Sequence, residues 1–174
     1  YTTDSAHSYP IIPNVLNRQF DVDELNTVWA GDITYIDTKS GWLYLAVVLD
    51  LASRRVIGWS MKPNKSKHLA SNALDMALRW RTPSDKLLHH SDQGAQYAST
   101  DYRATLNDHD IESSMSRRGD CFDNSVVESF FGSLKRERLN RYTFTDRSDA
   151  RQCVFQYIDM FYNPKRMHST LDYM

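Results

Sequence analysis

Three acidic residues in separate parts of the chain have the types and spacing expected of a metal-dependent phosphoryl-transfer site. Asp92 and Glu128 are separated by 35 residues, and Asp32 lies far upstream in a strand-like stretch. Carboxylate oxygens are ligands that hard divalent cations prefer, and a pair of such cations is a common means of breaking and making phosphodiester bonds. The local sequences are WAGDITYI, HHSDQGAQYAS and DNSVVESFFGSLKRE.

Each acid also has an ordinary structural interpretation. Asp32 can be a water-exposed aspartate at a strand edge, and Asp92 can be a turn residue, because Ser-Asp-x-Gly is good turn chemistry. Ser125 and Glu128 have the spacing of a capping box, in which Ser125 is the N-cap of a helix and Glu128 its third residue. Taken one at a time, these interpretations are preferable. The hypothesis of a shared site depends on the three acids occurring together.

The residues around Glu128 favour the shared site. Asn124 precedes Glu128 by four residues and Lys135 follows it by seven, so all three share one face of a helix. A carboxylate followed by a cation along one face suits a metal ion and then a DNA phosphate. This arrangement requires the helix to begin earlier than the capping box allows, with Asp123 or Asp120 as its cap.

The hydrophobic pattern predicts the elements that must position these residues. Strands are expected over residues 29–37, 42–50 and 55–61 as an antiparallel meander, with further strands over 86–90 and 111–115. The second strand is almost continuously apolar, which indicates burial on both faces. Helices are expected over residues 66–81, 99–108, 123–139 and 145–162. The order βββαβαβαα predicts an α/β fold, a mixed five-stranded sheet flanked by helices.

Some details of these elements are also predicted. Ser66 is expected to cap the first helix, and Asn163-Pro164 to end the last one. Apolar residues on the Glu128 helix form a stripe that should dock it on the sheet: Val127, Phe130, Phe131 and Leu134. The four tryptophans are expected in the core rather than as base-stacking surfaces: Trp29, Trp42, Trp59 and Trp80.

Composition bounds the kind of molecule. A chain of 174 residues with 41% apolar and 25% charged residues is one globular domain. Residues 1–25 are expected to form an arm or linker and residues 26–174 the core, and a start at Tyr1 suggests an excised domain. No membrane-spanning run or signal peptide is seen. Two isolated cysteines, Cys121 and Cys153, are expected to be free thiols, which fits the cytosol.

Cations near the acids are candidates for DNA contacts, although the net charge of −1 counts mildly against DNA binding. Arg117 and Arg118 lie in a loop before the Glu128 helix, and Lys135 and Arg136 lie towards its far end. A solvated surface is an equally good interpretation of them. No zinc-finger spacing exists, and the adjacent pair His89-His90 cannot easily ligate one metal, since alternate strand residues face opposite ways.

In combination, these motifs resemble the retroviral-integrase-like catalytic core of bacterial insertion-sequence transposases of the DDE type. The resemblance runs from about Trp29 to Tyr173 and includes YNPKRMHSTL near the C-terminus. It implies a ribonuclease-H-like fold, with the first acid on the first strand, the second after the fourth strand and the third on a helix. Asp32, Asp92 and Glu128 are then the catalytic and metal-binding residues, with Asn124 in an accessory role.

The resemblance implies a DNA transposase core that uses two Mg²⁺ (or Mn²⁺) ions. Water would first free a 3′-OH at the element end, and that 3′-OH would then attack a second phosphodiester. The expected partners are the element's terminal repeats, target DNA and further copies of the chain, in the bacterial cytoplasm at the nucleoid. The helix-turn-helix segments that recognise element ends are expected outside this sequence. Two alternatives stay open: another ribonuclease-H-like nuclease, or a non-catalytic DNA-binding or assembly module of that fold.

Overall fold

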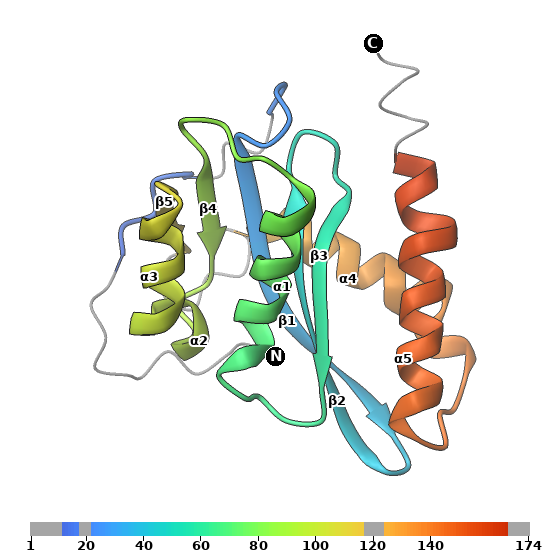
Figure 1. The fold of residues 1–174 in the computed structure, drawn as a ribbon. Coiled ribbons are helices and arrows are strands. Elements are labelled where there is room, and N and C mark those ends of the chain that lie inside the picture. Colours follow the sequence, from blue (N-terminus) through green and yellow to red (C-terminus); the bar gives the residue numbers. More distant parts are fainter. Residues whose placement is uncertain (1–11, 18–21, 117–123, 167–174) are drawn as a thin grey trace.

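A five-stranded mixed sheet forms the centre of the protein in a computed structural model that describes residues 12–17, 22–116 and 124–166 (Figure 1). The strand order is β3-β2-β1-β4-β5. An antiparallel meander is formed by β1 (Val28–Thr38), β2 (Gly41–Asp50) and β3 (Val56–Lys62). The sheet continues with β4 (Leu88–Ser91) parallel to β1, and β5 (Glu112–Met115) parallel to β4. The predicted mixed sheet is confirmed.

Helices cover both faces of this sheet. The helices α1 (His68–Trp80), α2 (Ala95–Ala98) and α3 (Thr100–Asp108) share one apolar cluster with it. The cluster on the other face contains α4 (Ser125–Glu137), η2 (Leu139–Arg141), α5 (Arg147–Gln156) and η3 (Tyr157–Tyr162).

The central strand β2 contributes to both clusters, as its continuous apolar sequence predicts. Alternate residues point to opposite faces of a sheet. Ala46 and Val48 accordingly pack on the α1 side. The α4 side receives Leu43, Leu45, Val47 and Leu49.

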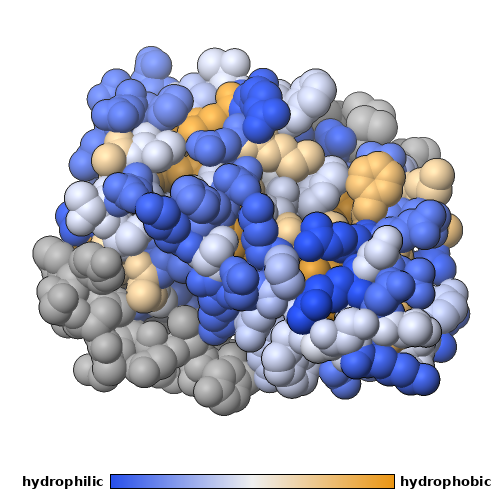
Figure 2. All heavy atoms as spheres, turned by 60° about the horizontal axis from the view of Figure 1, so that its bottom comes forward, coloured by the Kyte–Doolittle hydropathy of each residue, from blue (hydrophilic) through white to orange (hydrophobic). Residues whose placement is uncertain are grey.

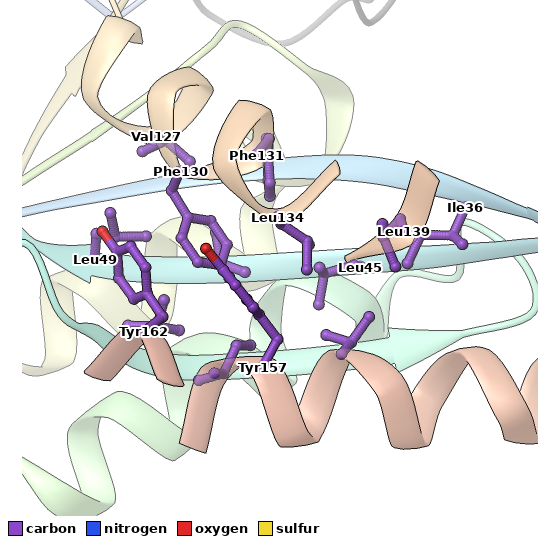
Figure 3. Close-up of a cluster of buried hydrophobic side chains, with 14 of the residues drawn as sticks. Ile36, Leu45, Leu49, Val127, Phe130, Phe131, Leu134, Leu139, Tyr157 and Tyr162 are labelled. Atoms are coloured by element: carbon purple, nitrogen blue, oxygen red, sulfur yellow. The ribbon is translucent and has the colours of Figure 1, made fainter. Parts of the chain in front are cut away.

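The docking of α4 rests on the predicted apolar stripe, which is confirmed. Val127, Phe130, Phe131 and Leu134 are buried, and Phe130 also packs edge-to-face against Tyr162, with ring centroids 4.7 Å apart (Figure 3). Burial of each large apolar side chain contributes about 1.5–3 kcal/mol. The helix that carries Glu128 is therefore held firmly along its length.

Three local expectations are wrong. Lys67, not Ser66, is the N-cap of α1, and the main-chain oxygen of Ser66 accepts the Leu69 N–H at 3.0 Å. Trp80 and Trp42 are 73% and 47% exposed, whereas they were expected in the core. Apolar periodicity gives the direction of a side chain but does not ensure that another element lies opposite it. Trp80 is the last residue of α1, and Trp42 lies near the start of β2.

The C-terminal helix passes through Asn163-Pro164, although the proline was expected to end it. Its N-cap is Asp146, whose side chain accepts the Asp149 N–H at 2.9 Å. After Gln156 the helix widens into the π-helical η3, and helical structure then continues to residue 166. In η3 the Asn163 N–H bonds to the Ile158 carbonyl, five residues back. Wider turns of this kind relieve the clash and the missing donor that proline introduces.

Part of the segment expected as an N-terminal arm lies against the sheet. Leu16 is buried, its N–H donates to the Ser114 hydroxyl at 2.8 Å, and the Met115 N–H donates to the Pro13 carbonyl at 3.1 Å. No helix among the described residues is long and apolar enough to cross a membrane.

Candidate active site

Asp32 and Asp92 lie at the same level of two neighbouring parallel strands. Ala30 of β1 pairs with His90 of β4, and each aspartate follows two residues later. Neighbouring strands are about 4.8 Å apart, and residues two apart on a strand face the same way. The register therefore brings together two acids that are distant in sequence.

The environments of the two aspartates differ. Asp32 is only 6% exposed and lies on a central strand, so the interpretation of an exposed strand-edge residue is wrong. Its Oδ1 accepts the Ile33 N–H at 2.8 Å. Asp92 follows β4, and its Oδ1 accepts the Gly94 N–H at 2.7 Å, which is the turn bond expected of it. Asp92 is thus a turn residue, as expected, and the strand register also places it beside Asp32.

The third acid is positioned by the N-terminus of α4. Asn124 is the N-cap of α4 and is buried, and its Nδ2 donates to the carbonyl of Gly31 at 3.1 Å, which fixes the start of the helix beside Asp32. Glu128 is then the fourth residue of the helix, so the capping box with Ser125 does not form. Asp123 and Asp120, the two caps expected from the sequence, lie outside the described part of the chain.

The acids interact electrostatically. The pKa of Asp32 is raised well above its ordinary value, first by burial, then by a hydrogen bond with the carboxyl of Glu128, and further by the charges of Asp92 and Glu128. Glu128 is exposed, so the cluster opens to solvent on the helix side.

These features fit a divalent cation. Within the described residues, no three His, Cys, Asp or Glu side chains already form a metal-binding group. The donors are nevertheless hard oxygens, and a divalent cation can relieve the repulsion between the clustered carboxylates. Next to them, the buried Oδ1 of Asn124 has no hydrogen-bond partner among the described residues.

The two histidines beside Asp92 have structural partners. His89 is fully buried, and its Nε2 lies 2.8 Å from the Tyr102 hydroxyl. Burial, followed by the neighbouring His90, lowers the pKa of His89 to about 4, so the ring is neutral at pH 7. The ring nitrogens of His90 lie 2.8 Å from Ser114 Oγ and 3.2 Å from Ser116 Oγ. These contacts fix the end of β4 from which Asp92 projects.

Tyr97 belongs to this site but was not singled out in the sequence. It is buried, and its pKa is raised by burial, then by Tyr102, and then by the charges of Asp32 and Asp92. Its ring also limits the size of the side chain at position 31. A Cβ in place of the Gly31 hydrogen would lie 3.3 Å from Tyr97 Cε1. The available signal was the final Tyr of HSDQGAQY, five residues after Asp92.

Of the four basic residues predicted to contact DNA, two lie in the described part of the chain. Lys135 Nζ lies 5.8 Å from the centroid of the Tyr35 ring. The guanidinium of Arg136 lies back over Gly132, where an added Cβ would be 2.9 Å from Nη1. Since Gly132 is one turn beyond Glu128, this cation points along α4 towards the acids. Arg117 and Arg118 lie outside the described residues.

Solved structures with the same architecture include an integrase core and a transposase core. The catalytic core domain of HTLV-2 integrase in complex with magnesium has a TM-score of 0.61 at 20% identity, over 79% of this chain and 89% of that one. The catalytic domain of Mos1 mariner transposase has a TM-score of 0.66 at 15% identity, over 83% and 76%. Identities this low show the fold alone. The fold is the ribonuclease-H-like one that the family resemblance implies.

Matches to protein-family models identify the family of this chain. A model described as Integrase core domain matches residues 23–121, and a second model with the same description matches residues 109–174. The chain therefore belongs to the integrase core domain family.

Relatives in insertion sequences cover almost the whole chain. Transposase InsF for insertion sequence IS3A of Escherichia coli (strain K12) is 49% identical over 164 residues, which are 94% of this chain and 57% of the relative. The insertion element IS600 uncharacterized 31 kDa protein of Shigella sonnei is 44% identical over 170 residues, 98% and 62%. The predicted resemblance to insertion-sequence transposase cores is confirmed. The chain spans only about three fifths of the length of these relatives.

Proposed function

We propose that this chain is the catalytic core of a DNA transposase that cleaves the 3′ ends of a mobile element and joins them to target DNA. The observation that carries the proposal is the meeting of Asp32 and Glu128 next to Asp92, brought about by strand register and by the Asn124–Gly31 tether. The similarity to insertion-sequence transposases supports this reaction over the other nucleases of the fold.

Asp32, Asp92 and Glu128 are the residues that would hold Mg²⁺ or Mn²⁺, and two ions are expected. Such ions supply a Lewis acid and lower the pKa of an attacking oxygen. Solved structures that share the fold include an integrase core with magnesium and a transposase catalytic domain with manganese. The buried carboxyl of Asp32 forms the fixed wall of the site, and Glu128 completes it from the solvent side.

The reacting groups come from water and DNA, and the chain positions them. In the first step the oxygen of water bonds to phosphorus while the bond from phosphorus to the 3′ oxygen breaks, leaving a 3′-OH at the element end. In the second step that 3′-OH oxygen bonds to a phosphorus of target DNA and displaces another 3′ oxygen. Lys135 and Arg136, along the Glu128 helix, contact backbone phosphates and hold the strand in line.

Partners and location follow from this reaction. The core acts on the terminal repeats of an element and on target DNA, together with further copies of the chain, at the nucleoid in the bacterial cytoplasm. Recognition of the ends requires segments that correspond to the remaining length of the relatives. Two alternatives stay open, another nuclease of this fold and a non-catalytic module. They differ from the proposed transposase in which DNA products, if any, are formed.

The test uses the full-length protein with element-end DNA and Mg²⁺ or Mn²⁺. Glu128→Gln should abolish both end cleavage and joining of a pre-cut 3′-OH end, because one site serves both steps. Glu112→Gln is the matched control, since Glu112 is an exposed glutamate on β5. Cleavage without joining would indicate a nuclease, and neither reaction in the wild type would indicate a non-catalytic module. Wild-type joining by the Glu128→Gln protein would refute the site.

A further inference from the structure

A hollow lies at the far end of β1 and α4, the elements that carry Asp32 and Glu128. It has a volume of about 400 Å³ and is formed between the end of β1, the C-terminal turns of α4 and the chain after η2. The lining side chains that matter here are Tyr35, Asp37, Lys39, Lys135, Asn140 and Tyr142. Of the two lysines and two tyrosines that line it, only Lys135 has a part in the proposed reaction.

The hollow is held in place by backbone contacts. The Lys39 N–H donates to the carbonyl of Phe144 at 2.9 Å, and Ser40 Oγ donates to the carbonyl of Thr145 at 3.2 Å. On the next strand, Arg147 Nε donates to the carbonyl of Trp42 at 2.8 Å. The β1–β2 turn is thereby fixed to the segment that precedes α5, so the two sides of the hollow cannot separate freely.

The hollow is aligned with the acids because α4 runs beside β1. Contacts at three levels show this: Asn124 with Gly31, Glu128 with Asp32, and Lys135 with Tyr35. Seven helical residues rise about 10.5 Å, and three strand residues extend about 10 Å, so both elements place the hollow roughly 10 Å from the acids. One DNA strand advances about 3.4 Å per nucleotide along the duplex axis, and this distance corresponds to about three nucleotides.

The chemistry of the hollow suits a nucleic-acid strand. Within the described residues, neither Lys39 nor Lys135 forms an ion pair with an acid. Tyr142 is 55% exposed, so its ring is accessible to a planar partner. Asp37 is an exposed carboxylate that also lines the hollow, and its negative charge repels a phosphate. The face at this end of the molecule is mostly hydrophilic, with apolar surface in small separate areas, which favours a charged partner (Figure 2).

We propose that this hollow anchors the DNA strand that reacts at the acids, about three nucleotides away from the reacting phosphodiester. Lys39 and Lys135 hold a backbone phosphate, and Tyr142 stacks on a base that is unpaired at that position. The inference rests on the proposed function and adds to it a strand-binding site in which Lys39 and Tyr142 take part.

The test measures binding of element-end DNA by the full-length protein as a function of salt. Lys39→Ala should lower the slope of log K against log salt by about 0.9, the value for one phosphate contact, and Lys39→Arg should restore it. Lys67→Ala is the matched control, because Lys67 is an exposed lysine at the start of α1, on the opposite face of the sheet. Asp37→Asn should tighten binding at low salt.

Two DNA forms test the tyrosine. Tyr142→Ala should weaken binding about 5- to 100-fold when the third nucleotide from the cleaved phosphate is unpaired, and less when it is paired. Equal behaviour of Lys39→Ala and Lys67→Ala, or an equal effect of Tyr142→Ala on both DNA forms, would overturn the proposal. The Glu128→Gln measurement is independent of these results. If Glu128→Gln abolishes joining while Lys39→Ala behaves like the control, the strand-binding site fails and the proposed function stands.

Discussion

The contact between Asn124 and Gly31 should matter more for activity than for stability. Asn124→Ala removes the 3.1 Å bond from Nδ2 to the Gly31 carbonyl, which holds the first turn of α4 next to Asp32. A net hydrogen bond is worth about 1 kcal/mol, and a buried acceptor left one partner short adds to that cost. No capping bond is lost, because the Asn124 side chain caps nothing in α4. Removal of its unpartnered Oδ1 returns part of the cost.

The expected loss in the free energy of unfolding is therefore about 1–2 kcal/mol. A domain stable by about 5 kcal/mol or more remains almost fully folded after such a loss. Activity depends instead on where the helix places Glu128 relative to Asp32. A displacement of about 1 Å in a catalytic group can cost about 100-fold in rate, and we expect a fall in the joining rate of this order.

The assay compares Asn124→Ala with Asp146→Ala. Asp146 caps α5 through its 2.9 Å bond to the Asp149 N–H, and loss of such a cap costs about 1 kcal/mol. The two variants should thus be similarly destabilised in urea unfolding of the 174-residue chain. In the full-length protein, joining of a pre-cut end should fall sharply for Asn124→Ala and stay within about twofold of wild type for Asp146→Ala. Equal activities of the two variants would refute the positioning role.

Three further predictions concern charge and packing. In the metal-free protein, the raised pKa of Asp32 means that stability declines as pH rises through that pKa; Asp32→Asn should be more stable at pH 7, and a melting temperature below wild type would contradict this. The lowered pKa of His89, about 4 against about 6.5 unfolded, should reduce stability by about 3 kcal/mol as pH falls from 6.5 to 4, and His89→Gln should flatten that dependence in urea titrations. Gly132→Ala should raise stability by up to about 1 kcal/mol through helix propensity, yet weaken DNA binding by displacing the Arg136 guanidinium; unchanged affinity would show that the guanidinium position is unimportant.

The sequence by itself determined the elements and the position of each acid within them. Continuous apolar residues in β2 required burial on both faces, and the stripe from Val127 to Leu134 required α4 to dock on the sheet. Motifs around the acids were sufficient for the family resemblance. These features depend on periodicity over a few residues, which is read directly from the chain.

Only the tertiary structure decided which residues meet. The register that sets Asp32 beside Asp92 depends on β4 pairing with β1, and the pairing of Asn124 with Gly31 closes a loop of more than ninety residues. The same holds for the hollow that both Lys39 and Lys135 line and for the exposure of Trp80. Local patterns specify which way a side chain points. The partner opposite it is set by strand order and helix packing, because those contacts join segments that no short window of sequence contains.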